Sequence, residues 1–151
     1  MIRILCFLAI AIILTSTTTC ARQEMSNPVD RTWISPAKIQ IGNIRPGSSV
    51  KQKVTIHNGN ETAKGFIIYY RTPDYVEEGF VAAPAEARNW LKISDENPNL
   101  MPRQTKEVQL VLNLPDDAQL PERWEFWIAI KEDVGDSLIA ELASRWLIIM
   151  Q

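Results

Sequence analysis

The sequence predicts an all-β domain, a sandwich of about seven short antiparallel strands behind an N-terminal export segment. Three observations predict it. Apolar and polar residues alternate along several segments after residue 31, and Gly, Pro, Asn and Asp mark the gaps between them. The first 20 residues form a separate apolar block. Alternation of this kind indicates strands with one face on a core and the other face in solvent.

The composition is that of an ordinary globular chain. Its 151 residues suit one domain, with 46% hydrophobic and 23% charged residues and a formal net charge of −2. A nucleic-acid partner favours a basic surface, so we expect no nucleic-acid partner. No long basic run is present either, and we therefore expect membrane contact only through an N-terminal anchor.

Residues 1–20 have the layout of a signal peptide or lipoprotein signal. A basic start at residues 1–3 is followed by an apolar run over 4–14 and small polar residues over 15–19. Cys20 resembles the lipidated cysteine of bacterial lipoproteins, although Thr17 stands where that pattern expects a large aliphatic residue. The uncharged stretch is also close to the lower length limit of a retained membrane anchor. Export would place the domain in the periplasm, at the cell surface or outside the cell.

The cysteines agree with this division of the chain. Cys6 and Cys20 are the only two, and both lie in the export segment. The domain expected over residues 32–151 then has no internal disulfide, no cysteine-based zinc site and no thiol nucleophile. Residues 21–31 are polar and contain an Asn-Pro step, which predicts a flexible tether.

The strands follow from period-two patterns. Apolar residues share one face of 106–114, from Val108 to Leu114, and one face of 122–132, from Trp124 to Ile130. The last segment also has apolar residues at helical spacing, but Val134-Gly135-Asp136 supplies a hairpin turn before it and favours a strand. The expected strands are 32–34 with 38–42, 50–57, 65–71, 90–94, 106–114, 122–132 and 137–150.

The only histidine, His57, lies at the end of one expected strand. Residues 58–64 connect that strand to the next and contain the turn-prone sequence NGNETAK. No cysteine and no Ser/Asp constellation accompanies the histidine, so we expect a solvent-facing residue rather than a catalyst. Asn60 begins an Asn-x-Thr sequon, which is an acceptor for glycosylation in a eukaryotic secreted protein.

The order of these features resembles the first, immunoglobulin-like domain of periplasmic pilus-assembly chaperones, the PapD-like fold. The segments that carry the resemblance are SPAKIQI, VTIHN, NWLKIS, NLMPRQTKEVQLVLN, LPDDAQLPERWEFWIAI and LIAELASRWLIIM. The resemblance implies a seven-stranded immunoglobulin-like sandwich over about 120 residues. The chaperones have a second sandwich domain, which we do not find in these 151 residues.

The resemblance also implies a way of binding. The last strand of such chaperones fills the groove of an incomplete subunit by β-strand addition. Two basic residues, matched here by Lys38 and Arg145, would clamp the subunit's terminal carboxylate, with a lysine where the family normally has arginine. This mode requires the last strand at a sheet edge. The apolar residues that would face the partner are Leu138, Ala140, Leu142, Trp146 and Ile148.

The long connection over residues 72–89 contains two aromatic residues, Tyr75 and Phe80. It is either a flap that folds back over the sandwich or a recognition loop. Trp127 is expected on an outward strand face, where it would form an exposed apolar patch unless this connection covers it.

Acidic residues occur in several loops but without calcium-loop spacing, and no paired carboxylates suit acid–base chemistry. We therefore expect no catalytic residue, no cofactor and no metal. The prediction is an exported, non-enzymatic module that binds a protein or peptide, in its sharpest form a chaperone-like module. The alternative is a structural or accessory subunit of a cell-envelope or appendage assembly, and the oligomeric state stays open.

Overall fold

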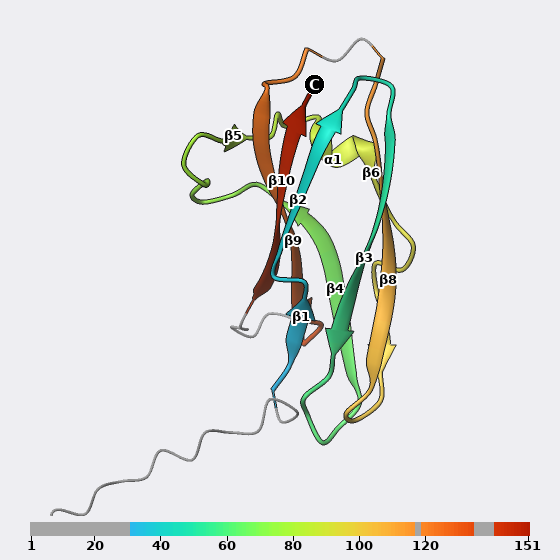
Figure 1. Cartoon of the computed structure of the whole chain (residues 1–151). Coiled ribbons are helices and arrows are strands. Elements are labelled where there is room, and N and C mark those ends of the chain that lie inside the picture. Colours follow the sequence, from blue (N-terminus) through green and yellow to red (C-terminus); the bar gives the residue numbers. More distant parts are fainter. Residues whose placement is uncertain (1–30, 117–118, 135–140) are drawn as a thin grey trace, which may run out of the picture.

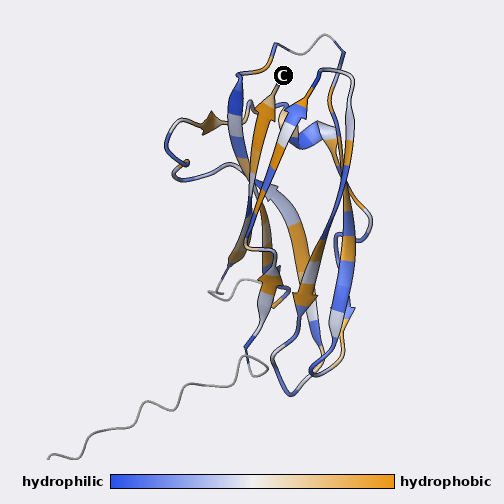
Figure 2. Ribbon diagram, viewed as in Figure 1, coloured by the Kyte–Doolittle hydropathy of each residue, from blue (hydrophilic) through white to orange (hydrophobic). Residues whose placement is uncertain are grey.

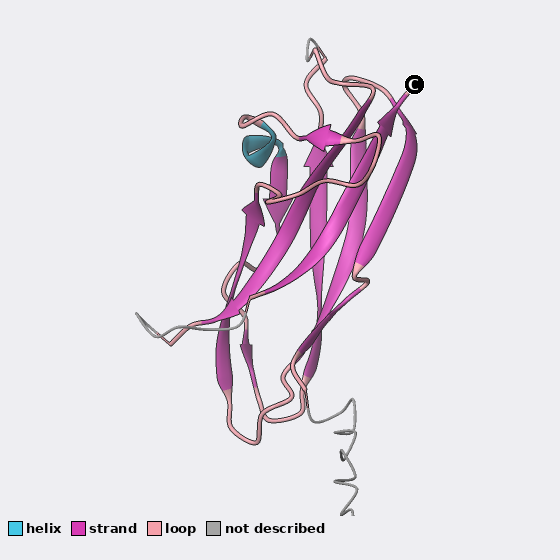
Figure 3. Ribbon diagram, turned by 90° about the vertical axis from the view of Figure 1, so that its left-hand side faces the viewer, coloured by secondary structure: helices cyan, strands magenta, loops and turns pink. Residues whose placement is uncertain are grey.

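The computed structural model describes residues 31–116, 119–134 and 141–151, which form two sheets packed face to face (Figure 1). One sheet has the strand order β1-β3-β8-β6, and the other has the order β2-β10-β9-β4-β7 with β5 paired to β9. The strands are β1 (Trp33–Ser35), β2 (Lys38–Ile44), β3 (Ser49–His57), β4 (Lys64–Arg71), β5 (Val81–Ala82), β6 (Leu91–Ile93), β7 (Asn99–Leu100), β8 (Thr105–Asn113), β9 (Arg123–Glu132) and β10 (Leu142–Met150). The short helix α1 (Ala87–Trp90) lies at one end of the domain (Figure 3).

The all-β sandwich expected from the sequence is confirmed. Each of the seven expected regions contains a strand, but the described residues form ten strands rather than seven. The first region holds two strands, and β5 and β7 are additional pairings of two residues each. The predicted signal and nearly all of the predicted tether, with Cys20, lie outside the described residues. No helix in the described part of the chain is long and apolar enough to cross a membrane.

The core lies between the two sheets, where the alternation predicted it. Val108, Leu110 and Leu112 of β8 are buried, as are the residues of β9 from Trp124 to Ile130 at every second position. Figure 2 shows hydrophobic segments recurring along these strands. Aromatic rings meet in the centre: Phe126 lies 5.8 Å from Trp124 and 5.4 Å from Trp146 between ring centroids. Burying each large apolar side chain contributes about 1.5–3 kcal/mol, so this layer dominates the stability.

The N-terminal strands cross from one sheet to the other. β1 pairs with the last three residues of β3, and β2 then pairs in parallel with β10 in the other sheet. Only Pro36 and Ala37 separate them, and the Ser35-Pro36 peptide bond is cis. Within the described part of the chain, residues 49–53 of β3 therefore pair with β8 alone, and β2 pairs with β10 alone. We call this side of the sandwich, formed by β2 and residues 49–53 of β3, the open margin.

The last strand is not an edge strand, which corrects the sequence-based prediction. Residues 142–150 do form a strand rather than a helix, but β10 lies between β2 and β9. Its pairing with β2 runs from Arg145 to Met150. Among the described residues of β10, Leu142, Ala143 and Ser144 pair with β9 alone, and so does Ile149 at the register shift between Ile148 and Met150. The physical reason is the crossing at Pro36, which lays β2 along the edge that the prediction left free.

His57 is buried rather than solvent-facing, which is a second correction. Its exposed fraction is 5%, because the ring of Trp33 stacks on the imidazole with 5.2 Å between centroids. The imidazole Nδ1 also lies 3.0 Å from the hydroxyl oxygen of Thr105. Burial at this position depends on a segment distant in sequence, so the local pattern of β3 gives no sign of it.

The connection between β3 and β4 is organised by Asn58, which is fully buried. Its side-chain Nδ2 donates to the backbone carbonyl oxygens of Thr62, Leu100 and Met101 at 2.9–3.1 Å. Its Oδ1 accepts from the backbone and side-chain nitrogens of Asn60, both at 3.0 Å. One side chain thus ties this connection to β7. The amide nitrogen of Asn60, to which a glycan would attach, is part of the same network.

Replacing Asn58 with alanine is expected to destabilise the domain by about 2–3 kcal/mol, because the buried carbonyl oxygen of Leu100 and the part-buried ones of Thr62 and Met101 lose their donor. Urea unfolding followed by tryptophan fluorescence measures the change. Asn97→Ala is the matched control, since Asn97 is exposed. Equal unfolding midpoints for the two variants would contradict the structural role given to Asn58.

Candidate functional site

Residues 72–86, which we call the flap, fold back onto the outer face of the six-stranded sheet (Figures 1 and 3). Its strand β5 pairs in parallel with β9, with Val81 opposite Trp124. Phe80 is buried, and the guanidinium of Arg123 lies 4.5 Å from its ring centroid. Of the two alternatives from the sequence, a flap over the sandwich or a recognition loop, the structure shows the flap. A role in recognition stays a prediction.

The outer face of this sheet buries apolar residues separately from the sandwich core. Trp127, Ala129 and Leu147 are buried, although they alternate with the inward residues of β9 and β10. The ring of Tyr75, from the flap, packs edge-on against Trp127 at 5.0 Å, and the guanidinium of Arg71 lies 5.5 Å from the same indole. Trp127 and Phe80 are therefore not exposed, and for Trp127 the alternative from the sequence holds, in which the connection over residues 72–89 covers it. Tyr75 itself is 65% exposed.

A fully buried carboxylate, Glu125, joins the flap to the sheet. Arg145 donates to it through Nε at 2.7 Å and a terminal nitrogen at 3.0 Å. The indole nitrogen of Trp127 donates at 2.6 Å, and the backbone N–H of Glu77 donates at 2.8 Å. A buried charge needs such partners because an unpaired carboxylate away from water is very costly. The flap supplies one of these four hydrogen bonds, so its position is coupled to the buried charge.

The environment of Glu125 acts on its pKa in two directions. Burial alone raises the pKa of this carboxyl, but the hydrogen bonds from Arg145, from the Glu77 backbone and from Trp127 outweigh it and hold the pKa below its ordinary value. The same pairing raises the pKa of the Arg145 guanidinium. At neutral pH the pair is therefore ionised on both sides. The four hydrogen bonds to Glu125 join β9, β10 and the flap.

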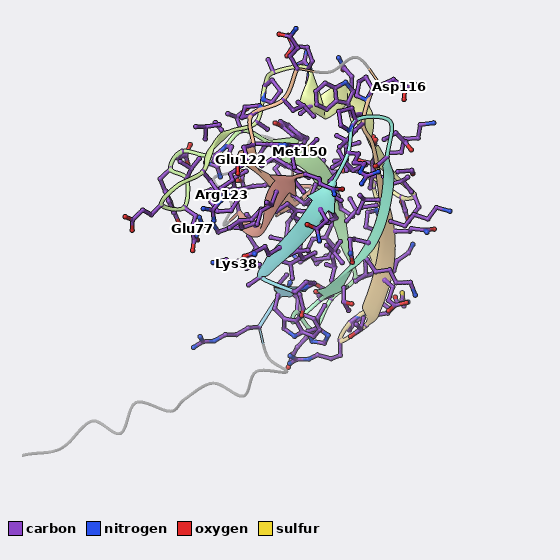
Figure 4. The ribbon with its side chains drawn as sticks, turned by 45° about the horizontal axis from the view of Figure 1, so that its top comes forward. Lys38, Glu77, Asp116, Glu122, Arg123 and Met150 are labelled. Carbon is purple, nitrogen blue, oxygen red and sulfur yellow. The ribbon has the colours of Figure 1, made fainter. Side chains whose placement is uncertain are left out.

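The two basic residues singled out in the sequence lie together, and both already hold a carboxylate. Lys38 of β2 is directly opposite Arg145 of β10 in the parallel register. Lys38 Nζ lies 2.7 Å from Glu77 Oε1, and Figure 4 shows these two side chains near each other. A terminal nitrogen of Arg145 lies 3.3 Å from Glu77 Oε2. The carboxylate between the two cations thus belongs to the flap. We call Lys38, Arg145 and Glu77 the flap clamp.

The apolar residues expected to face a partner lie elsewhere. Trp146 and Ile148 are fully buried in the sandwich core, and Leu142 packs against it, so in this structure the core covers the face that the sequence assigned to a partner. Leu138 and Ala140 fall outside the described residues. The reason is that β10 is covered on both sides by neighbouring strands, and its inward side chains fill the sandwich.

Sequence reasoning missed the two glutamates of this site. Glu125 alternates with Trp124 and Phe126 at a position where a strand with one solvated face would carry an exposed charge. Nothing in the local pattern indicates that a flap covers it. Among the described residues, no group of three or more His, Cys, Asp or Glu side chains is arranged to hold a metal ion.

Solved structures share this fold. A PapD-like domain of human CEP192 aligns with a TM-score of 0.60 at 12% identity, covering 96% of this chain and 97% of that one. The E. coli chaperone DraB aligns at 0.53 and 13% identity, covering 78% of this chain and 54% of DraB. A family 123 glycoside hydrolase from Clostridium perfringens aligns at 0.55 and 10% identity, covering 76% of this chain and 23% of the hydrolase.

These similarities show that the chain has a PapD-like, immunoglobulin-like fold, as the resemblance in the sequence implied. At such low identities they show the fold alone. The chain spans about half the length of the pilus chaperones it aligns with. No protein-family model and no curated protein sequence matches it.

Replacing Glu125 with glutamine is expected to destabilise the domain by about 1–3 kcal/mol at neutral pH, because Arg145 loses its buried charged partner and keeps only the longer contact with Glu77. The pKa of Glu125 is lowered by folding, so its contribution is present above the pKa of the unfolded chain, about 4.3. That contribution is lost as the pH falls through the lower pKa of the folded state. The stability difference between wild type and Glu125→Gln should therefore shrink below about pH 4.

Urea unfolding at a series of pH values measures this difference. Glu122→Gln is the matched control, because Glu122 lies nearby on the chain and is exposed. A Glu125→Gln variant as stable as wild type at pH 7 would rule out the anchoring role of the carboxylate.

Proposed function

We propose that this chain is an exported, non-enzymatic PapD-like module that binds an extended segment of a protein partner by strand addition to the outer edge of β2. The observation that carries the proposal is the position of β2, a seven-residue strand without proline that is hydrogen-bonded to β10 alone at the margin of its sheet. Such an edge presents unpaired backbone groups to another polypeptide. The chaperones among the solved structures support a protein partner and an exported location.

The backbone groups of β2 alternate in direction. The N–H of Arg145 donates to the carbonyl oxygen of Ala37 at 2.8 Å, which fixes the phase of the parallel pairing. In such a pair Ile39 and Ile41 direct their backbone groups at β10, whereas Lys38 and Gln40 direct theirs away from the sheet. The available edge is therefore centred on Lys38 and Gln40. We therefore propose strand addition at β2 in place of the last strand, to which the sequence-based proposal assigned it.

The flap clamp lies on the outer face beside this edge. In the proposed complex a carboxylate of the partner replaces Glu77 between Lys38 and Arg145, the two residues that the resemblance assigned to carboxylate binding. The ion pair with Lys38 is partly exposed, with 46% and 35% of the two side chains accessible, so exchanging one carboxylate for another costs little. The buried pair between Arg145 and Glu125 need not change.

A peptide library tests the edge. Nine-residue peptides with free carboxyl termini are selected on the purified chain, and the affinity of the selected peptides is measured by fluorescence anisotropy. Gln40→Pro removes an outward N–H without touching the pairing with β10, and should weaken binding about tenfold. Gln40→Thr keeps the N–H and should bind as wild type does. Peptides that bind Gln40→Pro as tightly as wild type would refute strand addition at β2.

The clamp is tested with the same peptides. Glu77→Gln removes the competing carboxylate and should tighten binding of free-acid peptides by about threefold to tenfold. The amidated forms of these peptides should show no such gain. Equal effects on both forms would show that Glu77 does not compete with a partner carboxylate. Glu78→Gln is the matched control on the same loop.

A second candidate function is a structural or accessory subunit of a cell-envelope or appendage assembly. One observation favours it over chaperone-like donation of the last strand. Because β2 covers β10 from Arg145 to Met150, that strand cannot enter a partner's sheet unless β2 leaves. A structural subunit forms defined multimers in light scattering at micromolar concentration, whereas the peptide-binding module stays monomeric without its partner.

A further inference from the structure

We propose that the free edge of β3 on the open margin is a second binding site, and that it takes an extended segment with acidic residues at alternate positions and apolar residues between them. It is distinct from the site at β2, since the two strands belong to opposite sheets. Backbone direction, charge and exposed apolar surface each point to this kind of partner.

Over residues 49–53, the outward backbone groups of β3 have no partner strand among the residues that the structure describes. The carbonyl oxygen of Ser48 accepts from the N–H of Leu114, and the N–H of Asn58 donates to Gln104, both at 2.9 Å. Even-numbered residues of β3 therefore face β8, and odd-numbered residues face the opposite way. β1 meets the odd residues only from Thr55 to His57. The backbone groups of Ser49, Lys51 and Lys53 point outward, along the part of the β3 edge that β1 does not reach.

The charge at this edge is positive. The side chains of Lys51 and Lys53 are exposed on the outer face, and together with Gln52 and Gln109 they line a depression of about 300 Å³. Lys53 contacts Glu107 at 2.8 Å, but with 63% and 60% of the two side chains accessible this pair is weak and readily exchanged. Lysines on an edge repel the same edge of a second copy, so self-pairing is disfavoured. An acidic strand is the complementary partner.

The inner side of the edge is apolar around Val50, and Gln52 also faces inward. Val50 of β3 is half-buried and packs against the core, and so do Ile39 and Ile41 of β2 in the opposite sheet. Because the open margin carries no strand beyond β1 on the β3 side, these side chains are covered only in part. An added strand would direct every second side chain between the sheets and cover them.

The register follows from these positions. In an antiparallel addition, residues opposite Lys51 and Lys53 lie on the outer face two positions apart, and the residue between them points inward opposite Gln52. The segment that fits therefore has two acidic residues on the outer face with one apolar residue between them. Further apolar residues follow at the inward-facing positions. A partner with basic residues at the outer positions would be repelled.

The test uses a fluorescently labelled peptide, Thr-Val-Glu-Val-Glu-Val-Thr, and a counterpart with lysine in place of each glutamate. We expect saturable binding of the acidic peptide to the purified chain, weakened by added salt, and no binding of the basic one. Amide hydrogen exchange should slow at Ser49, Lys51 and Lys53 when the acidic peptide is bound. No saturable binding, equal binding of the two peptides, or protection confined to β2 would overturn the proposal.

Variants separate the edge from charge in general. The double variant Lys51→Glu/Lys53→Glu should weaken binding at least about tenfold, since two attractive pairs become repulsive. Lys92→Glu is the matched control, because Lys92 is exposed on the same sheet at its other edge, on β6. If Lys92→Glu weakened peptide binding as much as the double variant, the effect would come from net charge alone. That result would refute a binding site at the β3 edge. Dimers of the peptide-free chain in light scattering would identify a second copy as the occupant and also refute it.

Discussion

The crossing of the chain between the two sheets at Pro36 is the constraint on which the rest of the structure depends. One continuous segment serves as the edge of both sheets, first as β1 on β3 and then as β2 on β10. Because it leaves β3 after three paired residues, the rest of that edge stays unpaired. Because it joins β10, the last strand becomes internal. The free edges of β2 and β3, and the internal position of β10, are thus consequences of the crossing at Pro36.

The buried carboxylate of Glu125 imposes a second constraint. A charge that is fully removed from water is tolerable only with several donors, and the sheet alone provides Arg145 and Trp127. The flap completes the set with the backbone of Glu77 and brings the Glu77 side chain between Lys38 and Arg145. Glu77 therefore does two things. Its backbone N–H holds the flap on Glu125, and its side chain pairs with Lys38 and Arg145.

The sandwich and its core could be predicted from period-two patterns, because the alternation of apolar and polar residues is enough to identify the inward residues of β8 and β9. The failures share one cause. The burial of His57 depends on Trp33, that of Trp127 on Tyr75, and the internal position of β10 on β2, and each partner is distant in sequence. The pairing of Lys38 with Arg145 could be anticipated from a family resemblance. The carboxylate between them could not, since no local signal marks Glu77 as the residue that reaches them.

The two free edges differ in what they offer a partner. At β2 the nearby cations are already satisfied by Glu77, so a partner gains only the difference between its carboxylate and that of the flap. At β3 the lysines face solvent and only Lys53 has a weak ion pair, with Glu107. An acidic strand therefore gains the attraction of Lys51 directly and that of Lys53 by exchange with Glu107, less the screening by salt. The same lysines disfavour pairing between two copies. In the proposed mode, positive charge along an incompletely paired edge has two effects: it disfavours pairing between two copies of the domain, and it favours a partner of opposite charge.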